Sequence, residues 1–181
     1  MIEPSDVRDA AARIAGRVRR TPVLAAEPLG GAACTWLKLE QTQHTGSFKA
    51  RGAFNRVLAA AEQGTLPAAG VVAASGGNAG LAVAYAAAEV GAAAEVYVPQ
   101  TAPAVKVARL RALGARVVQV GSRYAEAYEA ATKRCADTGA LFCHAYDQPE
   151  ICAGQGTLGL ELLEQTSGSS TPSCSPSAAA G

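Results

Sequence analysis

The sequence predicts an α/β fold in which a parallel sheet carries helices on its faces. Four short apolar runs have the length of buried strands, and alanine-rich segments of helical length separate them. A glycine follows the end of each helical segment, where a left-handed cap is favoured. Because strands and helices alternate with short loops, we expect right-handed crossovers and a self-contained unit over residues 68–147. The strands are expected at residues 71–75, 94–99, 115–120 and 140–145, the helices at 78–90, 103–113 and 123–137, and the capping glycines are Gly91, Gly114 and Gly139.

The segments on either side of this unit predict three further elements. Residues 4–18 carry apolar side chains at helical spacing, which predicts a short amphipathic helix that cannot continue through Pro22. Residues 35–40 alternate apolar and polar side chains, as a strand does. A helix is expected to begin at residue 153, and its glycines suit close packing against another backbone, so we expect it to belong to the core.

Composition narrows the class of ligand. Of the 181 residues 49% are hydrophobic, which is enough for a sizeable core. The net charge of +1 comes without a concentrated basic run, which argues against nucleic acid or an anionic membrane as the principal partner. No strongly apolar stretch is long enough to span a bilayer, and the N-terminus is polar and acidic, unlike a signal sequence. We therefore expect a cytoplasmic protein that binds a small molecule.

The cysteines and histidines are expected to be structural. The 5 cysteines are widely spaced and form no CxxC pair, so neither a disulfide framework nor a zinc site is indicated. Cys143 lies in an apolar run and should be buried. His44 lies in the loop before Lys49 and could approach a site there, whereas His144 ends a strand-like run.

Lys49 occupies an unusual place in its predicted helix. Residues 45–47 are loop and N-cap types, and apolar residues then recur at helical spacing, so Lys49 falls in the first turn. The helix dipole is positive at this end and disfavours a lysine. Beside that end and the Phe48 ring, the amine should have a depressed pKa, as Schiff-base formation near neutral pH requires. On this stretch alone, a surface lysine that happens to start a helix remains the simpler interpretation.

A second polar segment, SGGNAG at residues 75–80, lies where the first strand of the unit passes into a helix. Gly76 and Gly77 allow backbone amides to approach an anion closely, and Ser75 and Asn78 add hydrogen-bonding groups near a helix N-terminus. A carboxylate or a phosphate would suit this place, which is also where ligands of parallel sheets bind. The segment lacks the GxGxxG pattern of dinucleotide folds. A purely structural tight turn is the alternative.

Three segments together carry a family resemblance. TGSFKARGA at residues 45–53, SGGNAG at 75–80 and AGQGT at 153–157 resemble, in this order, motifs of the fold type II pyridoxal-phosphate enzymes, in particular the threonine and serine dehydratase branch. The resemblance implies a complete small parallel-sheet domain and an incomplete larger α/β domain. Residues 1–67 and 148–166 would belong to the larger domain and residues 68–147 to the small one, with residues 167–181 as an aberrant or disordered tail.

The same resemblance implies roles for individual residues. Lys49 would hold pyridoxal phosphate as a Schiff base and then remove the α-proton of the substrate, and Phe48 would pack beside the cofactor ring. Asn78 would contact the ring hydroxyl. The implied reaction converts L-threonine or L-serine into a 2-oxo acid and ammonia, and a family-like homo-oligomer is compatible with it. The substrate carboxylate would be held by Ser75, Gly76, Gly77, Asn78 and Ala79.

Two residues bear on the branch of the family. Relatives that make cysteine or threonine usually carry an aspartate directly after the lysine, where this chain has Ala50, and this favours a dehydratase. Racemase relatives need a second acid/base on the opposite face of the ring, supplied by a serine at the position of Gly76. Gly76 offers no such side chain, although racemases often eliminate as well. A serine-racemase-like enzyme therefore stays as an alternative.

The C-terminal segment suggests a different kind of alternative. Residues 167–181 are nearly all Ser, Pro, Ala and Gly, which is typical of a disordered extension. The family would continue here with a strand and a glycine-rich loop around the cofactor phosphate. A GC-rich back-translation read two nucleotides later gives GLVDTVLFAVGGGG, so we expect a frameshifted copy of that segment. A non-catalytic or vestigial binding fragment, with little turnover, is then the rival to an active enzyme.

Overall fold

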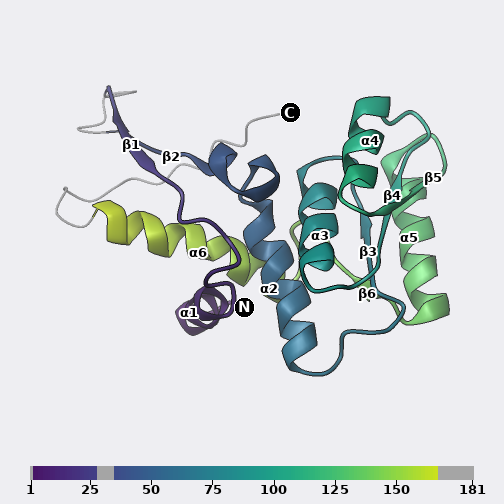
Figure 1. Cartoon of the computed structure of the whole chain (residues 1–181), viewed down its shortest axis with the longest axis horizontal. Helices are drawn as coiled ribbons and strands as arrows, with labels where there is room; N and C mark the ends of the chain where they lie inside the picture. Colours follow the sequence, from purple (N-terminus) through teal and green to yellow (C-terminus); the bar gives the residue numbers. More distant parts are fainter. Residues whose placement is uncertain (1, 28–34, 167–181) are drawn as a thin grey trace.

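The computed structural model describes residues 2–27 and 35–166, so the predictions for residues 167–181 lie outside the described residues. Figure 1 shows a parallel sheet covered by helices beside a second group of helices and a short hairpin. The strands are β1 (Val23–Ala26), β2 (Thr35–Lys38), β3 (Val71–Ala74), β4 (Ala94–Val98), β5 (Arg116–Gln119) and β6 (Leu141–Phe142). The helices are α1 (Pro4–Arg13), α2 (Lys49–Glu62), α3 (Asn78–Glu89), α4 (Ala104–Ala112), α5 (Tyr124–Thr138) and α6 (Pro149–Thr166), with 3-10 turns η1 (Glu40–Thr42) and η2 (His44–Gly46).

The four predicted strands form one parallel sheet in the order β5-β4-β3-β6, but β6 covers only Leu141–Phe142 of the expected residues 140–145. β3 lies in the centre and pairs with β4 on one side and with β6 on the other. Every residue of β3 and β4 is buried, because helices cover both faces of the sheet. Alternate side chains point to opposite faces: Val71 and Ala73 pack toward α3, while Val72 and Ala74 pack toward α5. The predicted α/β architecture is confirmed.

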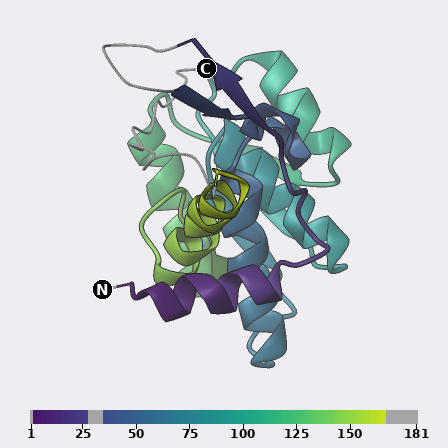
Figure 2. The same ribbon diagram turned by 90° about the vertical axis from the view of Figure 1, so that its left-hand side faces the viewer.

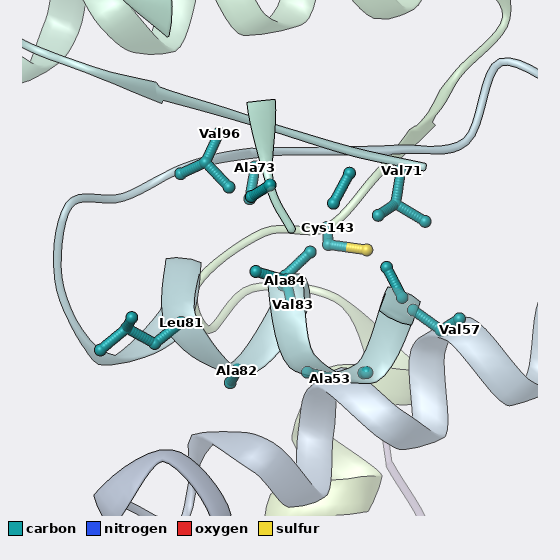
Figure 3. Packing of buried hydrophobic residues seen from close by; sticks show 14 of the residues in the cluster. Ala53, Val57, Val71, Ala73, Leu81, Ala82, Val83, Ala84, Val96 and Cys143 are labelled. Carbon is teal, nitrogen blue, oxygen red and sulfur yellow. The ribbon is translucent and has the colours of Figure 1, made fainter. Parts of the chain in front are cut away.

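Helix α3 lies between the sheet and α2 and is apolar around most of its circumference. Figure 3 shows Leu81, Ala82, Val83 and Ala84 of this helix between the strands and α2. A helix covered on two sides needs short side chains on both, and alanine provides them at little cost in side-chain entropy. The alanine-rich segment seen in the sequence is therefore the central layer of the core.

The predicted glycine caps are confirmed. The residues Gly91, Gly114 and Gly139 have φ angles of 71°, 81° and 71°, in the left-handed region that glycine adopts without strain. Each glycine ends its helix and turns the chain toward the next strand.

The remaining elements depart from the prediction at their ends. α1 stops at Arg13 and does not reach residue 18, because the chain turns at Gly16, which has a φ of 74°. α6 begins at Pro149, ahead of the predicted start at residue 153, since a proline is well suited to the first turn of a helix. The strand β1 was not predicted, and it pairs antiparallel with β2.

Helices α1, α2 and α6 form the second group, which Figure 2 shows from the side of the N-terminus. This group and the sheet unit correspond to the two predicted parts of the chain, and the division into domains stays a prediction. Among the described helices none is both long and apolar enough to cross a membrane. Within residues 2–27 and 35–166, His, Cys, Asp and Glu side chains form no cluster that could bind a metal ion.

Cys143 follows β6 and is only 2% exposed, so the prediction of a buried thiol is confirmed. Burial raises the pKa of this thiol to about 12. Since the thiolate is the reactive form, we expect iodoacetamide at pH 8 to leave Cys143 unmodified in the folded protein and to modify it after unfolding in urea. Mass spectrometry of the peptides checks this, with the half-buried Cys152 as internal control. Equal labelling of both residues in the folded protein would contradict the prediction.

Candidate active site

Lys49 is the first residue of α2, as predicted, but the cap before it differs from the expectation. Phe48 is the N-cap residue and makes no capping hydrogen bond with its side chain. Two of the three expected cap residues, Thr45 and Gly46, belong to the turn η2, in which Thr45 has a φ of 61°. Ser47 still assists, because its Oγ accepts the Lys49 backbone N–H at 3.4 Å. The lysine therefore projects from a tightly turned segment at the start of the helix.

The amine of Lys49 is held at one place. Its Nζ donates a hydrogen bond to the Ala145 carbonyl at 2.9 Å and lies 4.8 Å from the centre of the Phe48 ring. Burial lowers the pKa of Lys49, and the neighbouring Cys152 opposes this shift. The direction agrees with the prediction, and the largest cause is the loss of hydration on burial. The lower pKa increases the share of neutral, nucleophilic amine.

The carboxyl edge of the sheet brings the site together. Residues 75–79 follow β3 and residues 143–145 follow β6, and these two strands are parallel neighbours. Both segments therefore leave the sheet at the same edge, where ligands of such sheets bind. Lys49 reaches this edge from α2. A cavity of about 10 Å³, room for roughly one water molecule, is lined by Lys49, Ala53, Ala79, Val83, His144, Ala145, Ile151 and Gln155.

The glycines of the SGGNAG segment differ in whether packing requires them. The Gly77 N–H donates to Ser75 Oγ at 3.2 Å, and Asn78 begins α3 with its side chain exposed. A Cβ at Gly80 would collide with the Ser75 carbonyl, so this glycine is required by packing. A Cβ at Gly76 would make only an ordinary 3.4 Å contact with Val98. Packing therefore does not require glycine at position 76.

Sequence reasoning missed a buried ionic network beside Lys49. Arg51 is completely buried and donates two hydrogen bonds to Glu40, at 2.9 and 2.8 Å, and two to Glu161, at 2.7 and 3.0 Å. Lys38 joins the network through Glu161 at 2.7 Å. Burial alone would lower the pKa of Arg51, but the hydrogen bonds and attraction of both carboxylates raise it. The sequence contains one indication of this network. Arg51 lies three residues before Phe54, and this helical spacing places it on the buried face of α2.

Both histidines were expected to be structural, and His44 was the one whose place in the loop could have brought it near the site. His44 stacks on Tyr85 of α3 with ring centroids 5.0 Å apart, which agrees with a structural role. His144 instead lines the cavity beside Lys49. Gln155 lines the same cavity, and its amide nitrogen Nε2 is buried without a hydrogen-bond partner among the described residues. An unpaired buried donor costs stability, so this amide favours an acceptor in the cavity.

Comparison with known proteins places these motifs in one family. The family model described as "Pyridoxal-phosphate dependent enzyme" matches residues 14–179. An L-threonine ammonia-lyase from Thermotoga maritima is 41% identical over 168 residues, which cover 91% of this chain and 41% of that protein. The crystal structure of a threonine deaminase from T.th. superposes with a TM-score of 0.80 at 41% identity, covering 91% of this chain and 52% of the other. Maize serine racemase superposes with a TM-score of 0.85 at 33% identity, covering 92% and 51%.

The chain thus spans about half the length of these relatives. The predicted fold class, fold type II pyridoxal-phosphate enzymes, is confirmed by the same neighbours. Pyridoxal phosphate is the cofactor of the family. The chain belongs to the pyridoxal-phosphate dependent enzymes.

Proposed function

We propose that this chain carries the lysine-bearing half of a pyridoxal-phosphate-dependent ammonia-lyase, which converts L-threonine or L-serine to a 2-oxo acid and ammonia. The observation that carries the proposal is the Lys49 amine, half-buried, with a lowered pKa, at the carboxyl edge where the SGGNAG segment begins α3. The 41% identity to an L-threonine ammonia-lyase supports the choice of reaction.

The residues around Lys49 fit the reactive end of pyridoxal phosphate. The lowered pKa of Lys49 suits attack on an aldehyde, and the Phe48 ring beside the amine offers an apolar surface to a pyridine. Asn78 lies at the exposed start of α3. The cavity of about 10 Å³ is smaller than the cofactor ring, so binding of the cofactor would require some of the lining residues to move.

Each residue then has a task in the proposed reaction. When bound, pyridoxal phosphate supplies a conjugated ring that stabilises the negative charge left by removal of the α-proton. The Nζ of Lys49 would accept that proton. Ser75, Gly76, Gly77, Asn78 and Ala79 hold the substrate carboxylate at the positive N-terminus of α3.

A trapping experiment tests the assignment of Lys49. The chain has four lysines, Lys38, Lys49, Lys106 and Lys133, so a covalent adduct is easily located. After addition of pyridoxal phosphate and reduction with borohydride, we expect mass spectrometry to find the adduct on Lys49. Two other lysines serve as internal controls: Lys38, which forms an ion pair with Glu161, and the exposed Lys133. An adduct on Lys133 in preference to Lys49 would defeat the proposal.

Product analysis separates the proposed enzyme from its two rivals. Formation of 2-oxobutanoate from L-threonine supports the ammonia-lyase. Formation of D-serine from L-serine supports a racemase, which the superposition on maize serine racemase keeps as a second candidate. A Lys49 adduct without either product supports a binding fragment.

A further inference from the structure

The segment after β6 is folded by its own side chains. Nδ1 of His144 accepts the backbone N–H of Tyr146 at 3.2 Å and that of Asp147 at 2.9 Å. A nitrogen that accepts hydrogen bonds carries no proton, so the ring acts here as the side-chain oxygen of an asparagine does in an Asx-turn. Gln148 closes the segment, because its Oε1 accepts the His144 N–H at 2.9 Å and its Nε2 donates to the Phe142 carbonyl at 3.1 Å.

The His144 ring is also fixed in orientation by its aromatic neighbours. The ring of Tyr146 stands perpendicular to it at 85°, with 4.6 Å between centroids, and Tyr128 of α5 meets it at 81° and 5.9 Å. Phe142 lies 6.2 Å away. Edge-to-face contacts of this kind favour one ring position. Nδ1 is therefore kept toward the backbone of the turn.

This turn decides where the Lys49 amine rests. Ala145 lies between His144 and the two backbone donors, and its carbonyl accepts the Lys49 Nζ–H at 2.9 Å. The two residues are 96 positions apart in the sequence, so the contact depends on the fold of this turn and on the packing of the start of α2 against it.

We propose that His144 is a positioning residue for Lys49: its Nδ1 shapes the turn at residues 144–147 so that the Ala145 carbonyl holds the free amine at the site. The significance for catalysis rests on the proposed function of Lys49. The positioning itself does not, because it concerns the amine before any cofactor binds. Nothing in the proposed reaction requires His144 to exchange a proton with the substrate.

The proposal has a measurable consequence at the amine. A carbonyl acceptor stabilises the ammonium form more than the neutral amine, so this contact works against the effect of burial. Without the turn, Lys49 loses the acceptor and its amine becomes reactive at lower pH. Asparagine at position 144 should preserve the turn, since its Oδ1 can accept the same two N–H groups. Phenylalanine keeps a ring among the aromatic neighbours but removes the acceptor.

The test is competitive acetylation of the full chain with a trace of acetic anhydride between pH 6 and pH 11, without cofactor. Lys133, whose side chain is 74% exposed, provides the reference rate. We expect the original protein and His144→Asn to give the same Lys49 profile. In His144→Phe the midpoint should move to lower pH by about one unit, the equivalent of one charge-assisted hydrogen bond. Circular dichroism confirms that each variant is folded.

Two results would overturn the inference. One is a folded His144→Phe protein with an unchanged Lys49 profile, and the other is a His144→Asn protein whose midpoint moves. If His144→Phe does not fold, His144→Gln, which carries its acceptor one bond further out, takes its place with the same expected shift. If neither of these variants folds, a shifted Lys49 midpoint in His144→Asn would still overturn the inference, and an unchanged midpoint would support it. Because acetylation needs no cofactor, failure to trap pyridoxal phosphate on Lys49 would defeat the proposed function and leave this inference standing.

Discussion

Replacing Arg51 by methionine should lower the free energy of unfolding by about 3–5 kcal/mol. Methionine fills much of the same volume, so the loss comes from the charges that remain. Glu40 and Glu161 both have their carboxylates on the guanidinium, at distances of 2.7 to 3.0 Å. Glu40 is only 8% exposed, so solvent cannot replace the lost partner. Removing one member of a buried network leaves such a charge uncompensated, which costs more than the pair contributed.

The matched control is Arg20→Met, which removes the same charge from the surface. Arg20 meets Glu164 of α6 at 3.3 Å, with the two side chains 52% and 66% exposed. Such a pair is worth about 0–1 kcal/mol. Urea unfolding followed by circular dichroism measures both variants. A loss for Arg51→Met as small as that for Arg20→Met would show that the network contributes little to stability.

The network also affects the site, because Arg51 lies two residues after Lys49 in the first turn of α2. Its carboxylate partners come from the turn η1 and from α6, so it fixes the start of α2 from two sides. Lys38 extends the connection to β2 and also donates to the Thr21 carbonyl at 2.8 Å. The amine of Lys49 is thus carried on a helix end that several buried hydrogen bonds hold in place.

The parallel sheet could be predicted because its determinants are local. β3 is buried on both faces and reads as a continuous apolar run, and the glycine after each helix marks where it ends. β1 could not be predicted, since its residues do not alternate and its strand conformation depends on pairing with β2. Glu95 interrupts the run of β4 but is buried, because Arg134 of α5 pairs with it at 2.7 Å from 39 residues away. Such a partner leaves no signal near the strand.

The same distinction holds at the site. Lys49 and the SGGNAG segment could be found because each has an unusual sequence at a strand or helix end. Ala145 could not, since it acts through a backbone carbonyl that every residue possesses. His144 looked like the end of a strand, because the acceptors and donors of its turn depend on a ring orientation that only packing sets. A residue that acts through its side-chain type can be found in the sequence, whereas a residue that acts through its position in the fold cannot.

The close approach of α2 and α6 gives the second large effect, which we expect for Gly154→Ala. A Cβ at position 154 would lie 2.6 Å from the Arg51 carbonyl oxygen, 2.7 Å from the Asn55 Cβ and 2.8 Å from the Gly52 Cα. Two of these atoms belong to the backbone of α2 and the third is fixed to it, so the helices must move apart to accept one methyl group. Overpacking of this kind costs about 3 kcal/mol.

Gly159→Ala is the control on the same helix, because no atom of the residues that the structure describes lies within 4 Å of the Cβ it would add. There alanine should raise the free energy of unfolding by about 0.5–1 kcal/mol, through its better helix propensity. The two variants therefore make the same chemical change in α6 but should shift the free energy of unfolding in opposite directions, and urea unfolding measures the difference.

Separation of α2 from α6 would also shift Lys49 relative to the carboxyl edge, so we expect Gly154→Ala to reduce trapping of pyridoxal phosphate at Lys49 while Gly159→Ala leaves it unchanged. Equal stability of the two variants would mean that the helices are not in the close contact that Gly52 and Gly154 permit.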